Sequence, residues 1–218
     1  MLEEIKNQYV LGNIFDWFPK IPDNSVDLLF TSVPDLEELD SIGLLEDYQN
    51  FLNKSFAEIS RITKPEGFIV MGQTDRRKGG FIFPKHIEIW EWLTKTEKKW
   101  RLKEIKILIK TNNFISINLF RLTYSQVLIF TINGKITQEK KSSDFMKDIW
   151  HYPSPENKNF WNQYFCDMVV ETLTKENDFV VDPFAGRGTV LKSAKKKHRN
   201  YFGAEIKEEC YYPNYLNE

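Results

Sequence analysis

The chain has 218 residues, of which 41% are hydrophobic and 15% are aromatic, and this composition predicts a folded domain with a sizeable core instead of a disordered chain. Its 30 basic and 31 acidic residues leave a net charge of −1, which argues against broad, non-specific binding of nucleic acid, although local basic patches can still attract phosphate. The sequence shows no apolar run that could span a membrane and no signal-peptide core, so we expect a protein of the cytoplasm or the nucleus. Its histidines and two cysteines show no metal-ligand spacing, so we expect free thiols and no bound metal.

The first informative segment in chain order is a polar loop that follows a short apolar run. Asp27-Leu28-Leu29-Phe30 is typical of a buried parallel strand, and Thr31-Ser32-Val33-Pro34-Asp35 follows it directly. Upstream, Gly12-Asn13 precedes a short aromatic stretch, and Ile21-Pro22-Asp23-Asn24-Ser25 leads into the strand. The loop after this strand is the first candidate site.

The middle of the chain alternates predicted helices and strands. Apolar residues at three- and four-residue spacing predict a helix from about Asp47 to Ile62, which Lys64-Pro65-Glu66-Gly67 ends, and a buried strand over Phe68–Gly72 follows. The pattern then predicts a helix over Pro84–Lys98, paired strands over Trp100–Lys110 and Phe120–Phe130, and a helix over Asn159–Leu173. The basic stretch Arg76-Arg77-Lys78-Gly79-Gly80 is expected to be a loop, which either contacts phosphate or is simply solvated.

The most informative feature is the turn Asp182-Pro183-Phe184-Ala185-Gly186-Arg187-Gly188-Thr189. It follows the apolar run Phe179–Val181 and precedes a helix-like segment, Val190–Lys197. Glycines let a ligand approach the backbone, and the helix start offers unpaired N–H groups, so the turn suits a cofactor crevice at a switch point of an open α/β sheet. It lacks the spacing of a dinucleotide or phosphate loop. Downstream, Tyr201–Glu205 is predicted to be a strand that ends in an acid able to accept two ribose hydroxyls.

These motifs resemble those of the amino-group DNA methyltransferases, which bind S-adenosylmethionine. The turn matches their D-P-F-x-G-x-G-T pattern, with Arg187 where a small residue is common, and Ser32-Val33-Pro34-Asp35 resembles their catalytic Ser-Pro-Pro-Tyr motif, the version typical of cytosine. Because the catalytic-like loop comes first and the cofactor turn last, the chain is similar to the permuted branch called the beta group. The resemblance implies an α/β, Rossmann-like methyltransferase fold with a seven-stranded, mostly parallel sheet, one antiparallel strand near its edge and helices on both faces. Residues 1–218 would form a single domain without a separate target-recognition domain.

The resemblance also assigns roles to individual residues. Ser32, Pro34 and Asp35 would face the target, where a polar side chain and a backbone carbonyl take up the two N–H bonds of an exocyclic amine whose lone pair is otherwise delocalised. In the family an aromatic residue stacks on the flipped-out base. Asp35 cannot stack in this way, but its carboxylate could accept a proton or a hydrogen bond. The residues that would hold the cofactor are Asn13, Thr31, Asp182, Pro183, Phe184, Ala185, Gly186, Gly188, Thr189 and Glu205, joined by residues 154–160 near the methionine moiety.

The implied function is methyl transfer from S-adenosylmethionine to the exocyclic amine of cytosine or adenine in DNA or RNA. Two alternatives stay open, namely a non-catalytic nucleic-acid-binding or scaffold subunit derived from such an enzyme, and a methyltransferase of free nucleotides. Sequence recognition would come from loops over residues 73–85 and 135–153, or from a homodimer partner or another subunit. The basic run Lys195–Arg199 ends the predicted cofactor helix, where cations suit the helix dipole, so its expected role is structural.

Overall fold

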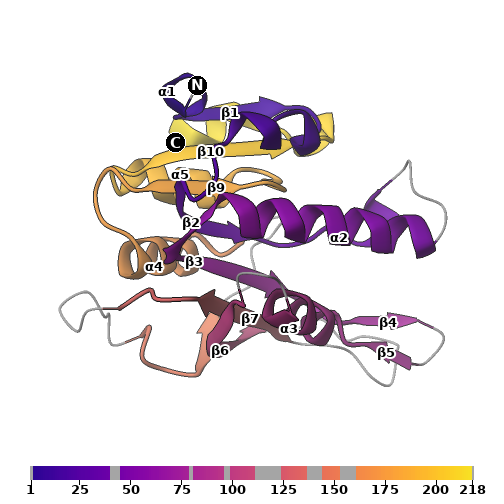
Figure 1. The fold of residues 1–218 in the computed structure, drawn as a ribbon. Coiled ribbons are helices and arrows are strands. Elements are labelled where there is room, and N and C mark those ends of the chain that lie inside the picture. Colours follow the sequence, from indigo (N-terminus) through magenta and orange to yellow (C-terminus); the bar gives the residue numbers. More distant parts are fainter. Residues whose placement is uncertain are drawn as a thin grey trace.

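The computed structural model describes residues 2–39, 45–78, 81–95, 99–110, 124–136, 144–152 and 161–217, and these residues form one large sheet with helices on its two faces (Figure 1). The helices are α1 (Leu2–Ile5), α2 (Leu45–Ile62), α3 (Lys85–Lys95), α4 (Gln163–Leu173) and α5 (Thr189–Lys196). The strands of the large sheet are β1 (Gln8–Leu11), β2 (Val26–Thr31), β3 (Thr63–Gln73), β6 (Arg101–Lys110), β7 (Tyr124–Thr131), β8 (Ile149–Tyr152), β9 (Phe179–Asp182) and β10 (Asn200–Glu205).

The sheet is mostly parallel, and one strand runs against the others. Its order is β1-β10-β9-β2-β3-β7-β6-β8, in which β7 is antiparallel to both β3 and β6 and all other neighbouring pairs are parallel. The predicted α/β architecture is therefore confirmed. The predicted number of strands was wrong, because the described residues form an eight-stranded sheet. Its two edge strands, β1 and β8, have four residues each, which is too short for a recognisable hydrophobic pattern.

The chain changes direction across the sheet between β9 and β2. These two strands are parallel neighbours, with Leu28 opposite Val180 and Leu29 opposite Val181. From β9 the chain passes through α5 to β10 on one side, and from β2 it passes through α2 to β3 on the other side. Such a switch point opens a crevice beyond the carboxyl ends of the two strands. The segments that follow β2 and β9 therefore meet, although they lie at opposite ends of the sequence.

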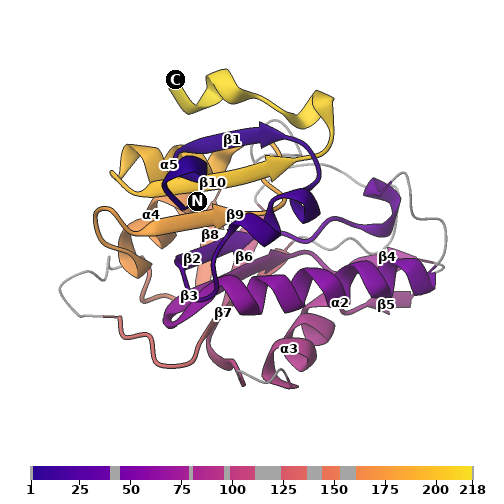
Figure 2. The same ribbon diagram turned by 45° about the horizontal axis from the view of Figure 1, so that its top comes forward.

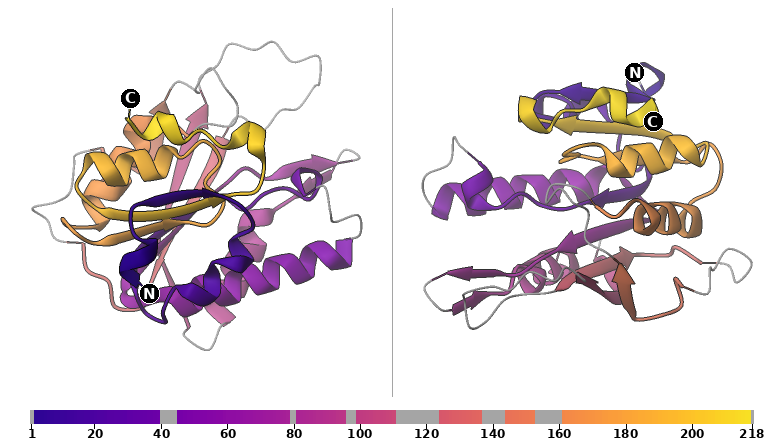
Figure 3. Two further views of the ribbon diagram at one scale, coloured as in Figure 1. Left: turned by 90° about the horizontal axis from the view of Figure 1, so that it is seen from above. Right: turned by 180° about the vertical axis from the view of Figure 1, so that it is seen from behind.

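Two hydrophobic clusters cover the two faces of the sheet. One includes Leu52 of α2 and Leu93 of α3, and the other includes Val169 of α4 and Leu191 of α5. Successive residues of a strand point to opposite faces, so each of the central strands contributes to both clusters. Viewed from above, α2 lies on one side of the sheet and α4 and α5 lie on the other (Figure 3). No helix in the described ranges is long and apolar enough to cross a membrane.

The predicted helices are confirmed, with shifted ends. α2 buries Tyr48, Leu52, Phe56 and Ile59 at the spacing that the sequence indicated, and it begins at Leu45. α4 begins later than expected because the side chain of Asn162 accepts a hydrogen bond from the N–H of Phe165 at 3.1 Å, which is a helix N-cap. The predictions for residues 154–160 lie outside the described residues.

The basic stretch that was expected to be a loop contains a strand. Arg76–Lys78 is β4, and it pairs antiparallel with Phe81–Phe83, which is β5. The sequence signal for this hairpin is Gly79-Gly80, a pair that commonly separates two hairpin strands. In the chain, the hairpin lies between β3 and α3. Figure 2 shows it near the N-terminal end of α2.

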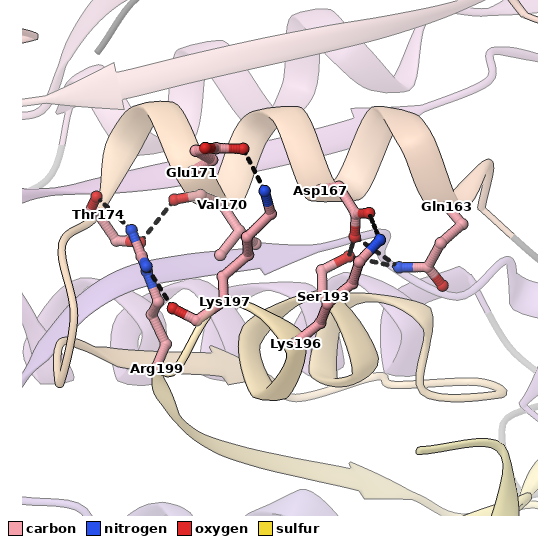
Figure 4. A network of polar contacts seen from close by, with 9 residues as sticks. All are labelled: Gln163, Asp167, Val170, Glu171, Thr174, Ser193, Lys196, Lys197 and Arg199. Carbon is pink, nitrogen blue, oxygen red and sulfur yellow. Dashed lines mark hydrogen bonds and ion pairs between the residues drawn. The ribbon is translucent and has the colours of Figure 1, made fainter. Parts of the chain in front are cut away.

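The second basic run has the structural role that we expected. Lys196 forms an ion pair with Asp167 of α4 at 2.5 Å, and Lys197 pairs with Glu171 of the same helix (Figure 4). Arg199 donates a hydrogen bond of 2.8 Å from its Nε to the hydroxyl of Thr174. These cations therefore fasten the end of α5 to α4.

Candidate active site

The turn after β9 has the backbone geometry that its glycines predicted. Gly186 and Gly188 have positive φ angles of 52° and 82°, which side-chain-bearing residues rarely adopt. Gly188 is the N-cap of α5, so the turn leads directly into a helix start, and the N–H of Ala185 is fixed by the carbonyl of Ala204 at 2.9 Å. Pro183, Ala185 and Thr189 are buried within this turn. The turn is therefore anchored against β10.

Asp182, the last residue of β9, joins the turn to the loop after β2. Its Oδ1 accepts a hydrogen bond from the Thr31 hydroxyl at 2.7 Å and another from the Phe184 N–H at 3.2 Å. Burial raises the pKa of Asp182 to about 7, since the two hydrogen bonds only partly offset the loss of water and the negative charge of Glu205 acts in the same direction as burial. A positive ligand beside this carboxyl would favour its charged form.

Glu205 ends the neighbouring strand β10 and faces the same turn. Its two carboxylate oxygens accept hydrogen bonds of 2.8 Å from the N–H groups of Gly186 and Lys207. Burial raises the pKa of Glu205, against these backbone hydrogen bonds. Its carbonyl accepts the N–H of Gly12 at 2.8 Å, which brings Asn13 to the end of β10. The structure therefore brings Asn13, Gly186 and Glu205 into one region.

Tyr9 and the carboxyl-terminal segment are parts of this region that the sequence did not indicate. The Tyr9 hydroxyl donates to the carbonyl of Gly186, and the Tyr211 hydroxyl donates to the carbonyl of Tyr9 at 2.9 Å. The guanidinium of Arg187 lies 4.0 Å from the centre of the Tyr212 ring. Arg187, unusual for this turn, is therefore held by a cation–π contact. No local pattern could have linked residues this far apart in the sequence.

Aromatic residues line one side of the turn. The Phe184 ring lies 5.7 Å from that of Phe51 on α2, and Phe51 in turn contacts Phe15 at 5.8 Å. Phe184 itself is only partly buried. Phe18 and Trp150 are core residues, since only 1% and 2% of their surface is exposed.

The loop after β2 is held by hydrogen bonds to the Ser32 side chain and to two backbone carbonyls. Gln73, at the end of β3, accepts a hydrogen bond from the Ser32 hydroxyl at 3.3 Å and donates one from its amide to the Val33 carbonyl at 3.2 Å. The Tyr48 hydroxyl donates to the Pro34 carbonyl at 2.9 Å. The side chain of Val33 is buried in the core, which explains how an apolar residue fits at this position.

Asp35 makes a contact that the sequence could not reveal. Lys85, the first residue of α3, forms an ion pair with its carboxylate. The Asp35 N–H donates to the Glu38 side chain at 2.7 Å, which starts a short 3-10 helix over Leu36–Glu38. The carboxylate is therefore oriented by Lys85, and it is partly exposed at the side of the loop.

A buried polar cluster lies behind the loop. Asp75 accepts a hydrogen bond from the Gln126 amide at 3.1 Å and contacts the Nδ1 atom of His86 at 2.7 Å. The neighbouring hydroxyls of Thr74 and Ser125 are 2.6 Å apart. Because β3 and β7 pair Gln73 with Gln126, this cluster supports the residue that holds Ser32.

The described structure thus brings the predicted cofactor residues and the predicted target residues to one edge of the sheet. The hydrogen bond between Thr31 and Asp182 connects the two sets. Within the described ranges, no group of three or more histidine, cysteine, aspartate and glutamate residues could hold a metal ion. The arrangement places two acids, the buried Asp182 and the partly exposed Glu205, beside the glycine turn, where they could favour a cationic ligand next to the Ser32 loop.

Comparison with protein families gives one model that covers most of the chain. The N6/N4 DNA methylase family matches residues 26–215, a range that includes the loop after β2, the glycine turn and β10.

Two curated relatives are type II methyltransferases of greater length. The chain is 26% identical over 250 residues to the type II methyltransferase M.BglII of Bacillus subtilis, a match that covers 93% of this chain and 66% of that protein. It is 26% identical over 209 residues to the type II methyltransferase M.MwoI of Methanothermobacter wolfeii, which covers 88% of this chain and 30% of that protein. The chain therefore spans less than two thirds of either relative.

Solved structures share the fold over most of their length. A protein of Thermus thermophilus, described as a DNA modification methylase and complexed with S-adenosyl-L-methionine, has a TM-score of 0.73 at 25% identity, covering 93% of this chain and 89% of that chain. The PvuII cytosine-N4-specific DNA methyltransferase has a TM-score of 0.78 at 19% identity, covering 93% and 83% respectively. The second match supports the fold alone.

Proposed function

Because the chain belongs to the N6/N4 DNA methylase family, we propose that it transfers a methyl group from S-adenosylmethionine to the exocyclic amine of a cytosine or an adenine in DNA. The observation that carries this proposal is the hydrogen bond of 2.7 Å between Thr31 and Asp182. It joins the glycine turn directly to the loop that contains Ser32. RNA, which the sequence had left open, has no support among the relatives described above, and DNA is therefore the proposed substrate.

The residues of the glycine turn fit S-adenosylmethionine, which carries a positive sulfonium, an amino group, a ribose and an adenine. Buried Asp182 is an acid whose charged form a positive group would favour. Glu205 accepts two backbone N–H groups and keeps acceptor sites for ribose hydroxyls, and the partly buried aromatic ring of Phe184 suits an adenine ring. When bound, this cofactor supplies an electrophilic methyl group.

The loop after β2 would bind the target amine by accepting hydrogen bonds from its N–H groups. An exocyclic amine has two N–H bonds and a delocalised lone pair, so acceptors for the two hydrogens make the nitrogen more nucleophilic. Gln73 takes the hydrogen of the Ser32 hydroxyl, which leaves the lone pairs of Oγ free to accept an N–H from the amine. The same Gln73 fixes the Val33 carbonyl. We assign Gln73 as a positioning residue for the loop.

Asp35 would replace the stacking aromatic residue of related motifs with a charged acceptor. Lys85 orients its carboxylate, and the carboxylate oxygens can accept an N–H of the target base or the proton that the amine loses after methyl transfer. Asp35 therefore has a chemical role in this proposal, whereas a tyrosine would hold the base by stacking.

The test is a comparison of Asp35→Ala with Asp47→Ala, an exposed acid in the first turn of α2 that serves as the control. We expect Asp35→Ala to slow tritiated-methyl transfer to duplex DNA by about 100-fold or more, the usual contribution of an acid–base group. The affinity for S-adenosylmethionine, measured by titration calorimetry, should stay within about two-fold, because Asp35 lies outside the glycine turn.

Three outcomes would contradict the proposal. Wild-type protein that binds S-adenosylmethionine and DNA but transfers no methyl group would be a scaffold subunit. Transfer to free nucleotides and not to duplexes would make it a nucleotide methyltransferase. Undiminished transfer by Asp35→Ala would remove Asp35 from the reaction.

A further inference from the structure

Exposed apolar side chains gather on one small element beside the candidate site. All three residues of β5 are exposed, namely Phe81 at 76%, Ile82 at 46% and Phe83 at 49%. Ile87 and Trp90 of α3 are each 44% exposed. Within the described residues, this short stretch holds five of the thirteen exposed large hydrophobic side chains. Such a concentration marks a binding surface, because scattered exposure is the ordinary case.

The strand that pairs with β5 carries positive charge. β4 is Arg76-Arg77-Lys78, and its residues lie in register with Phe83, Ile82 and Phe81. Three consecutive cations stand out in a chain whose net charge is −1. This combination of positive charge in the sequence of one strand and exposed apolar side chains on the other matches duplex DNA, which offers phosphates along its backbone and apolar groups such as thymine methyls on its base edges. A purely hydrophobic protein partner would account for β5 and leave the cationic strand unexplained.

The base of the hairpin is fixed to the sheet. Asp75 precedes β4 and is buried, and it contacts the Nδ1 atom of His86, just after β5, at 2.7 Å. Its other carboxylate oxygen accepts a hydrogen bond from Gln126 of β7 at 3.1 Å. The two ends of the hairpin are thus held together and to the sheet, so the hairpin has a defined position relative to the site.

The hairpin is also joined to the target loop. Lys85 lies two residues after Phe83 and forms the ion pair with Asp35. Figures 1 and 2 show β4 and β5 extending from the edge of the molecule at which β3 ends, the edge that carries the Ser32 loop. A duplex with one nucleotide at the Ser32 loop would therefore extend along the hairpin.

We infer that the β4–β5 hairpin is the duplex-DNA contact of this chain and supplies target recognition next to the methylated nucleotide. The inference rests on the proposed function. The major groove of B-DNA admits a two-stranded β-ribbon, so β4 and β5 can lie in it. In this position the positive charge that the sequence gives to β4 favours the phosphates, and Phe81 and Phe83 make apolar contacts with the base edges.

The test compares the double variant F81A/F83A with the control I105A/I149A, whose side chains are similarly exposed, at 46% and 50%, on β6 and β8. The probe is a fluorescein-labelled duplex of random sequence, and binding is measured by anisotropy. We expect F81A/F83A to bind at least about ten-fold more weakly and the control to match the wild type. S-adenosylmethionine affinity should be unchanged in both variants, which shows that they are folded.

A second comparison isolates the charge. R76A/R77A should reduce the slope of log affinity against log salt concentration by about 1 to 2, whereas K103A on β6 should leave the slope unchanged. Together with the first comparison, this result would separate the phosphate contacts of β4 from the base contacts of β5.

Different failures have different meanings. If the wild type binds and methylates duplex DNA but F81A/F83A binds it equally well, the inference is wrong and the proposed function stands. If, in addition, sedimentation shows a wild-type dimer that F81A/F83A dissociates, the patch is a self-association surface. If the wild type binds S-adenosylmethionine but neither binds nor methylates DNA, the proposed function fails and the inference fails with it.

Discussion

At the scale of single residues, Asp182 is an acid in surroundings that oppose its charge. It is 2% exposed, and burial raises its pKa from 3.8 to about 7. The folded protein therefore binds this proton more tightly than the unfolded chain. The resulting stabilisation is complete below about pH 4 and is lost as the pH rises through 7, where the buried carboxyl becomes charged.

In the cofactor-free protein, Asp182→Asn should remove this contribution of Asp182 to the pH dependence of the free energy of unfolding. The asparagine oxygen can still accept hydrogen bonds from Thr31 and Phe184, so the turn should keep its geometry. Between pH 5 and pH 8, the free energy of unfolding of the wild type should fall by roughly 3 kcal/mol more than that of the variant, because each pKa unit corresponds to about 1.4 kcal/mol. Urea unfolding at both pH values measures the difference. Parallel pH profiles would show that Asp182 does not hold the proton.

The residue scale also shows what sequence can reveal about a site. The turn geometry of Gly186 and Gly188 was predictable, because positive φ angles restrict the residue type. The contact between Lys85 and Asp35 was not, because fifty residues separate the two side chains and no periodic pattern connects them. Gln73 was missed for the same reason, since a glutamine at a strand end carries no distinctive signal.

At the scale of elements, strand β3 requires a residue without a side chain where it passes Trp161. A Cβ atom added at Gly72 would lie 1.8 Å from the nearest ring atom of Trp161, closer than any real contact. Trp161 packs on Phe165 of α4, with 5.4 Å between ring centres, so it cannot move without disturbing that helix.

Gly72→Ala should therefore destabilise the protein by about 1 to 3 kcal/mol, the usual cost of overpacking. Gly12→Ala is the matched control, because its added Cβ would lie 3.8 Å from Trp17, an ordinary contact. Thermal unfolding monitored by near-ultraviolet circular dichroism compares the two variants. Equal stability would mean that the Trp161 ring has room to shift.

Elements were predictable in proportion to their length and regularity. α2 buries a long amphipathic face, and its pattern survives small errors at the ends. The edge strands β1 and β8 have four residues each, and pairing with a neighbour, more than local preference, makes them strands. The β4–β5 hairpin had a glycine-pair signal, but the three cations before it suggested a loop that either contacts phosphate or is solvated.

At the scale of the whole molecule, the switch point between β9 and β2 unites the two ends of the chain in one site. The Thr31–Asp182 hydrogen bond spans 151 positions in the sequence. A ligand on the glycine turn should therefore also stabilise the Ser32 loop, since ligand binding to the folded state protects the segments that it orders.

Hydrogen exchange measures this coupling directly. Saturating S-adenosylmethionine should slow exchange at amides 184–188 and also at the Ser32, Val33 and Asp35 amides of the 32–35 loop, while amides of β6 should change little. Thr31→Val removes the hydroxyl and keeps the side-chain shape, so it should abolish protection of 32–35 and retain that of 184–188. Protection confined to the turn in the wild type would mean that the two segments respond independently.

The same hydrogen bond implies an order of substrate addition. A cationic cofactor draws Asp182 into its ionised state, and an ionised carboxylate can only accept the hydrogen of the Thr31 hydroxyl, whereas the neutral acid can also donate its own. Thr31 immediately precedes Ser32 in the chain. In the proposed reaction we therefore expect cofactor loading to fix the acceptor loop before the duplex binds, which would make S-adenosylmethionine the leading substrate.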